Sequence, residues 1–262
     1  MADDHHDGES AAADHEHGRS HGYADAGSHA LLGGLTVSAN GLRIEASDTR
    51  IDSDAELEWS YEVRDEDGTV VTEFEETHDQ LAHLILVRRD LTRFQHLHPD
   101  LDEDGTWSVA FALPDPGADR AFVDVLVDGR STTLGVDLLA SGPADYETRP
   151  GSTREASADG YDVAMTPESV PPDENVTLEF EVHHDGDVAS LEPYLGALGH
   201  LVALRDGDLA YLHVHPEETD PEDGRVRFGA RFPTAGRYRL FLQAKPSGEL
   251  ITASFDVRVE GA

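Results

Sequence analysis

Six histidines occur in two sets with identical spacing, and their side chains could bind a metal ion. They are His83, His96 and His98 in the first set, and His200, His213 and His215 in the second. Each set follows the pattern His-x12-His-x-His-Pro, and the two copies lie 117 residues apart. Imidazole is the commonest metal ligand among side chains, because its neutral ring offers a nitrogen lone pair. The repeated spacing predicts a metal site formed once in each copy.

The second set is expected to lie on a β-hairpin. Residues 200–205 and 208–214 are apolar-rich runs typical of strands, and Asp206-Gly207 between them is a signal for a two-residue turn. A turn at these residues would pair His200 with His213, and directly opposed residues point to the same face of a hairpin. The turn therefore predicts that two imidazoles of the set face each other.

The third histidine of each set is expected on that same face. His215 lies two residues beyond His213, and side chains two apart on a strand share a face. In the first copy Arg89-Asp90 replaces Asp-Gly, but the equal spacing predicts the same pairing. A single strand histidine is more commonly a surface or hydrogen-bonded residue. The cross-strand arrangement, present twice, favours metal binding.

The composition is strongly acidic and almost free of lysine. The chain has 54 acidic and 19 basic residues, for a formal charge of −35, and Lys245 is its one lysine. Such a composition is typical of a salt-in halophile, where molar salt shortens the Debye length to about 3 Å and screens self-repulsion. The absence of a basic patch argues against nucleic-acid binding.

The absence of cysteine narrows the choice of metal. Thiolate sites, iron–sulfur clusters, disulfides and a cysteine nucleophile are excluded. Only Met1 and Met165 could supply a thioether, so a Cu(I) site is not expected. Imidazole ligation suits a divalent transition metal, and the general affinity order places Cu(II) first and Zn(II) next.

An internal duplication organises the chain. Residues 40–63 align without gaps on residues 159–182, and Trp59-x-Tyr61-x-Val63 matches Leu178-x-Phe180-x-Val182. Each copy consists of short runs with alternating apolar residues and no strong helical pattern. We therefore predict an all-β chain of two tandem antiparallel β-sandwich domains, immunoglobulin-like or cupredoxin-like. The predicted segments are a tail over 1–34, repeat 1 over 35–140, a linker over 141–157 and repeat 2 over 158–262.

The predicted tail is acidic, low in complexity and rich in histidine. It contains His5, His6, His15, His17, His21 and His29. A disordered tract of this kind can capture metal loosely, or its histidines can be passengers in a solvated acidic segment. No apolar run is long enough to cross a membrane, and no signal peptide is expected, because the first residues have neither a positive region nor an apolar core. The expected location is cytoplasmic, or outside the cytoplasm if the chain is a processed form.

Three segments resemble an uncharacterised family of two-domain proteins, found mostly in actinobacteria and haloarchaea. They are FQHLHP (94–99), YLGALGHLVALRDGDLAYLHVHP (194–216) and AGRYRLFLQ (235–243). Members are described as heavy-metal-binding or secreted proteins, and the resemblance covers residues 40–260. It implies a metal-related, copper-related and non-enzymatic role.

The leading hypothesis is a protein that sequesters, buffers or delivers a divalent ion through a three-histidine site in each domain. Its partners would be the ion and a metal-transport or metal-accepting protein. One alternative is a metalloenzyme, since three histidines and an open position also form catalytic sites. No general base or catalytic residue is identifiable, which argues against that reading. The other alternative is a protein-interaction module, the usual role of immunoglobulin-like domains.

Overall fold

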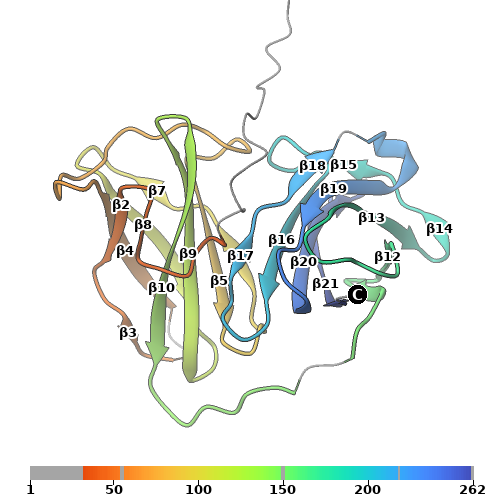
Figure 1. The fold of residues 1–262 in the computed structure, drawn as a ribbon, viewed down its shortest axis with the longest axis horizontal. Helices are drawn as coiled ribbons and strands as arrows, with labels where there is room; N and C mark the ends of the chain where they lie inside the picture. Colours follow the sequence, from red (N-terminus) through yellow and green to blue (C-terminus); the bar gives the residue numbers. More distant parts are fainter. Residues whose placement is uncertain (1–31, 54–55, 149–150, 218, 261–262) are drawn as a thin grey trace, which may run out of the picture.

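The protein consists of two β-sandwiches joined by a linker (Figure 1). The computed structural model describes residues 32–53, 56–148, 151–217 and 219–260. Within these ranges every regular element is a strand except the 3-10 helix η1 (Pro221–Asp223). The predicted all-β class and the pair of antiparallel sandwiches are confirmed. None of the described residues forms a helix that could span a membrane.

The first sandwich has two five-stranded sheets. One has the order β1 (Ser38–Ala39), β2 (Leu42–Ala46), β4 (Glu56–Arg64), β8 (Thr106–Ala112), β7 (Asp100–Leu101). The other has the order β3 (Arg50–Ile51), β10 (Arg130–Ala140), β9 (Gly117–Val127), β5 (Ala82–Arg88), β6 (Gln95–Leu97). Alternate residues of β4, including Trp59, Tyr61 and Val63, point inward and are buried, as their spacing predicted.

The second sandwich repeats this order of strands. One sheet consists of β11 (Glu155–Ala158), β12 (Tyr161–Thr166), β13 (Asn175–His184), β19 (Arg225–Arg231) and β18 (His215–Glu217), with β14 (Asp187–Val188) beside β13. The other consists of β15 (Leu191–Glu192), β20 (Gly236–Pro246), β16 (Gly199–Arg205) and β17 (Tyr211–Leu212), with β21 (Ile251–Val259) beside β20. A parallel pairing also recurs, since Ala140 pairs with Ile51 in the first copy and Val259 with Val170 in the second.

The two sandwiches pack against each other through the sheets that carry the histidine hairpins. All seven residues of β5 are buried, because one face of the strand contacts its own core and the other contacts the second sandwich. The shared apolar cluster is Ile85, Val87, Leu91, Phe122, Val202, Leu204, Leu209, Tyr211 and Phe241, with Phe94 against it. In Figure 1, β5 and β16 lie near the middle of the molecule.

This interface has an approximate twofold symmetry that follows from the duplication. Phe94 stacks on Phe241 with ring centroids 4.3 Å apart, and the equivalent pair, Tyr211 and Phe122, lies 5.6 Å apart. Phe94 and Tyr211 occupy equivalent positions, and so do Phe241 and Phe122. The same pair of positions therefore meets twice across the interface, once from each side. The symmetry brings the two histidine hairpins face to face, which the spacing of the motifs did not predict.

The segment just before the first sandwich also lies between the repeats. Gly33 exchanges two backbone hydrogen bonds with Tyr211 in the second repeat, and Gly34 donates to the carbonyl of Thr133 in the first. Of the tail predicted over 1–34, residues 1–31 lie outside the described residues, and Gly33 and Gly34 are held by these contacts. At the other junction, β11 begins at Glu155, within the segment predicted as a linker over 141–157.

Candidate functional site

Both hairpins have a register two residues away from the predicted one. In the second hairpin Leu204 pairs with Tyr211, whereas a turn at Asp206-Gly207 alone would have paired it with Leu209. The backbone N–H of Arg205 donates to the carbonyl of Ala210, so the loop holds four residues. The predicted pairing of His200 with His213 is therefore wrong. A shift of two residues keeps every side chain on its predicted face.

A buried leucine in each loop explains the longer turn. Leu209 and its equivalent Leu91 both adopt a φ of 61° and are fully buried in the interface between the repeats. Such a conformation is unfavourable for a leucine, and it persists because apolar burial at the interface offsets the strain. The register thus depends on contacts with the other repeat.

The first hairpin brings its three predicted ligands together. His83, on β5, and His96 and His98, on and just after β6, each have a ligand atom within 4.8 Å of those of the other two. His96 pairs opposite Ile85, so the three rings lie on the face that contacts the second repeat. Among the described residues, this is the one group of three or more histidines and carboxylates close enough to share an ion.

Hydrogen bonds determine which nitrogen of His83 and of His96 carries a proton. Nε2 of His83 lies 2.9 Å from the carbonyl oxygen of Thr77, which only accepts, so this nitrogen is the donor. Nδ1 of His96 donates to Oε1 of Gln243 at 2.6 Å. In the neutral rings the remaining nitrogens, Nδ1 of His83 and Nε2 of His96, carry lone pairs, and they lie 3.0 Å apart. Two lone pairs therefore face each other at the centre of the cluster.

Burial keeps several of these rings neutral. Desolvation, together with a smaller effect of neighbouring imidazoles, lowers the pKa of His96 to about 3 and the pKa values of His98 and His200 to about 4. At neutral pH these side chains are uncharged, which is the state that can bind a metal ion.

The cluster also contains a buried nitrogen without a partner and an adjoining cavity. Nε2 of His98 is buried and makes no hydrogen bond within the described part of the chain. A cavity of about 70 Å³, with His83 and His96 in its wall, lies beside the cluster. This space can hold an ion with a bound water.

Two further histidines lie close to the first triad. His200 of the second repeat is buried, and its ring centroid lies 6.1 Å from that of His96 and 6.5 Å from that of His83. His78 is exposed, and its ring centroid lies 5.0 Å from that of His200. The histidine cluster, as used below, consists of His78, His83, His96, His98 and His200.

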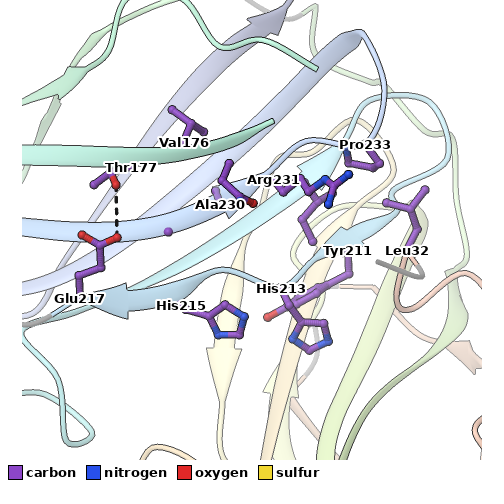
Figure 2. Close-up of a pocket in the computed structure, with 13 residues that line it drawn as sticks. Leu32, Val176, Thr177, Tyr211, His213, His215, Glu217, Ala230, Arg231 and Pro233 are labelled. Carbon is purple, nitrogen blue, oxygen red and sulfur yellow. Dashed lines mark hydrogen bonds between the residues drawn. The ribbon is translucent and has the colours of Figure 1, made fainter. Parts of the chain in front are cut away.

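The second triad is not assembled, contrary to the prediction of one site per copy. β17 ends at Leu212, and the chain then crosses to the other sheet, where His215 begins β18 and pairs with Gly229. In the first repeat the crossing comes later, since β6 extends to Leu97 and β7 begins at Asp100. His215 therefore lies on the other sheet from His200 and lines, with His213, a second pocket (Figure 2), while His213 also borders the cavity that His200 lines.

His213 makes a different hydrogen bond from its equivalent, His96. The Thr133 hydroxyl donates to the Asp124 carboxylate at 2.9 Å, so its oxygen accepts from Nε2 of His213, also at 2.9 Å. In neutral His213 the lone pair is then on Nδ1, whereas in His96 it is on Nε2. The two equivalent rings are held in opposite tautomers.

The residues that orient His96 and His213 were not found from the sequence. They are Gln243 for His96, and Asp124 with Thr133 for His213. Asp124 and Gln243 occupy equivalent positions when the repeats are aligned with the offset of 119 that applies to the strands around them. That alignment shows where the repeats differ, but only the docking of the two sheets brings these side chains to the histidines.

The solved structures that match this chain have low similarity to it. InvD of Yersinia pseudotuberculosis has 14% identity and a TM-score of 0.29, over 86% of this chain and 59% of that one. Invasin, a bacterial integrin-binding protein, has 15% identity and a TM-score of 0.27, over 84% and 39%. The titin tandem A164-A165 has 11% identity and a TM-score of 0.23, over 85% and 97%. The chain spans less than two thirds of the two bacterial chains, and likeness at this level carries no argument about function.

A family model gives the clearer result. No similar sequence was found among curated proteins. The model described as "Domain of unknown function (DUF8832)" matches residues 36–142 and again residues 156–261. The two matches cover both sandwiches and most of the chain, in agreement with the duplication. The chain therefore belongs to the DUF8832 family and carries two copies of its domain.

Proposed function

We propose that this protein binds a divalent transition metal, Cu(II) most tightly and Zn(II) next, through His83, His96 and His98. Its role is to sequester, buffer or deliver the ion, without catalysis of its own. A metal-transport or metal-accepting protein would be its partner. The proposal replaces two separate sites with one site on the first hairpin.

The observation that carries the proposal is the pair of lone pairs on His83 and His96. Two nitrogens bound to one ion at about 2.0–2.1 Å, at angles of 90–109°, lie about 2.9–3.4 Å apart. The observed separation of 3.0 Å falls in this range. A proton between them would place a positive charge on this buried pair of rings, with the ring of His98 also beside them. A divalent ion satisfies both lone pairs at once.

The hydrogen bonds around the triad support the same reading. Metal-bound histidines generally donate their other ring N–H to a carbonyl or carboxylate, which fixes the tautomer. His83 donates to the Thr77 carbonyl and His96 to the Gln243 amide oxygen. Each ring is thus oriented with its acceptor nitrogen toward the centre of the cluster.

Neutral imidazole ligands would distinguish this site from the many carboxylates of the chain. Its 54 carboxylates offer many weak oxygen sites, which suit Mg²⁺ and Ca²⁺. Imidazole favours copper, zinc and nickel over these hard ions. An imidazole cluster therefore gives the protein a means to select a transition metal from a medium rich in other cations.

A titration of the full chain in molar salt at pH 7.5 tests the proposal. The wild type is compared with a tail variant in which six histidines are replaced by Ala: His5, His6, His15, His17, His21 and His29. We expect one tight equivalent of Cu(II), and more weakly of Zn(II), in both proteins, and loose binding of further ions only with the tail histidines present. Loss of all tight binding in the tail variant would assign the metal to the tail and overturn the proposal.

A further inference from the structure

The histidine cluster lies at the junction of the two repeats, and the second repeat contributes a ring to it. His200 is 9% exposed and lies with His83 and His96 in the wall of the same cavity. Its position follows from the docking of β16 against the first repeat, because Val202, two residues further on the same face, belongs to the shared apolar cluster.

The orientation of His200 leaves one nitrogen available. Its Nε2 lies 2.8 Å from the carbonyl oxygen of Tyr194, which only accepts, so Nε2 carries the proton. The lone pair of the neutral ring is then on Nδ1. His83 has the same arrangement with Thr77, at the equivalent position of its own repeat. His83 and His200 are thus held in the same tautomer, one on each side of the interface.

The spacing of the rings is compatible with one shared ion. The centroid of a bound imidazole lies about 3.2 Å from the metal, so two rings on one ion have centroids about 4.5–6.4 Å apart. Within the first triad the separations are 4.8, 5.2 and 5.3 Å. The ring centroid of His200 lies 6.1 Å from that of His96, within this range, and 6.5 Å from that of His83, just beyond it. A small inward rotation of its ring brings it into the shell.

We propose that His200 is the fourth imidazole ligand, so that the ion bridges the two repeats. This inference rests on the proposed function and deepens it, because it makes the metal a clamp between the sandwiches. Binding of the ion and docking of the repeats are then linked, and each strengthens the other by the same factor. His78 packs edge-on against His200 at the exposed side of the cluster.

The test compares His200→Ala with His184→Ala in the full chain loaded with one equivalent of Cu(II). His184 is an exposed histidine at the end of β13, in the same repeat as His200, and serves as the matched control. Nitrogen couplings in electron paramagnetic and electron–nuclear double resonance spectra count the bound imidazoles. We expect four in the wild type and in His184→Ala, and three in His200→Ala.

Affinity and amide exchange give two further readouts. Loss of an outer partner of a metal ligand costs about 10–100-fold in affinity, so loss of a ligand should weaken Cu(II) binding at least about tenfold. Cu(II) should slow amide exchange in residues 85–91 and 202–209 of the wild type, and this effect should disappear in His200→Ala. His200→Gln, which keeps a donor for the Tyr194 carbonyl, should behave like His200→Ala.

The outcomes separate the two proposals. An unchanged nitrogen count and affinity in both His200 variants would show that the first repeat holds the ion alone, and would overturn the bridging role. Absence of tight Cu(II) binding in the wild type would instead overturn the proposed function. Thermal unfolding of the metal-free variants identifies any His200→Ala protein that has failed to fold, and His200→Gln then decides the question.

Discussion

The two hairpins share their histidine spacing, their register and a left-handed leucine in the loop, yet they orient their imidazoles differently. In the first hairpin His96 donates from Nδ1 to Gln243 and turns Nε2 toward His83. In the second hairpin the equivalent His213 donates from Nε2 to Thr133. The difference arises because the opposite repeat places Gln243 beside His96 but Thr133 beside His213. A duplicated ligand pattern therefore predicts a duplicated site only when the surrounding residues are duplicated as well.

The largest expected effect tests the symmetry of the interface itself. Phe122 and Phe241 are equivalent, buried, and in contact with Tyr211 and Phe94 respectively. Replacement of either by Ala removes a large buried ring, which generally costs about 3–5 kcal/mol. We expect similar losses in the free energy of unfolding for the two variants, measured by chemical denaturation in high salt. A large loss in only one of them would contradict a symmetric interface.

The next effect contrasts the two hairpins as metal sites. His96→Ala/His98→Ala should weaken Cu(II) binding by about 100-fold or more, equivalent to about 2.7 kcal/mol. The matched variant His213→Ala/His215→Ala should keep one tight equivalent with nearly normal affinity. Isothermal titration of the two proteins measures the contrast. If the second variant loses an equivalent of its own, each hairpin carries a site and the original expectation of two sites is restored.

A smaller effect is expected from the residues that orient the rings. Gln243→Ala removes the acceptor for Nδ1 of His96, and loss of such an outer contact weakens metal binding by about 10–100-fold. Thr133→Val removes the acceptor for Nε2 of His213 and should leave the affinity within about twofold. Nitrogen-15 spectra of the metal-free proteins should show a change of tautomer at His96 in the first variant and at His213 in the second. Equal affinities for the two variants would rule out a role for Gln243.

The last effect concerns the stability of the metal-free protein at low pH, where the change is spread over several pH units. The pKa of His96 is lowered to about 3 in the folded state, against about 6.5 in an unfolded chain. Below about pH 6.5 the unfolded state therefore binds the extra proton, and folding stability falls until the pH reaches the folded pKa. The His96 contribution is on the order of 1 kcal/mol per pH unit in this window. His96→Ala should show a shallower decline between pH 6.5 and 4 than the exposed control His213→Ala, and parallel curves would contradict this.

The strands and their inward faces could be predicted because they follow from local patterns. The alternation of Trp59, Tyr61 and Val63 marks a half-buried strand, and the alignment of the repeats located its counterpart. The same patterns placed His83, His96 and His98 on one face. The continuous apolar run in β5 indicates burial on both sides, but it does not say which surface covers the outer one.

The features that could not be predicted all depend on contacts distant in sequence. Leu91 and Leu209 set the hairpin register through their burial in the other repeat. The early crossing of the chain after Leu212 places His215 on the other sheet, away from His200, and nothing in the spacing of the histidines signals it. Gln243 reaches His96 from 147 residues away. Sequence spacing can place candidate ligands on one face of a hairpin, whereas the orientation of their rings depends on the surface of the other repeat.

The approximate twofold axis has a consequence for any chain that contains only one such domain. A face in which each position contacts its own counterpart across a twofold axis is self-complementary, and this is the requirement for an isologous homodimer. A single-domain relative that keeps the apolar residues at the positions of Ile85, Val87, Phe94 and Phe122 presents such a face. In that dimer both histidine sets would be identical by symmetry. Covalent linkage of the two copies frees each from this constraint, which is how Gln243 and Asp124 can differ within one molecule.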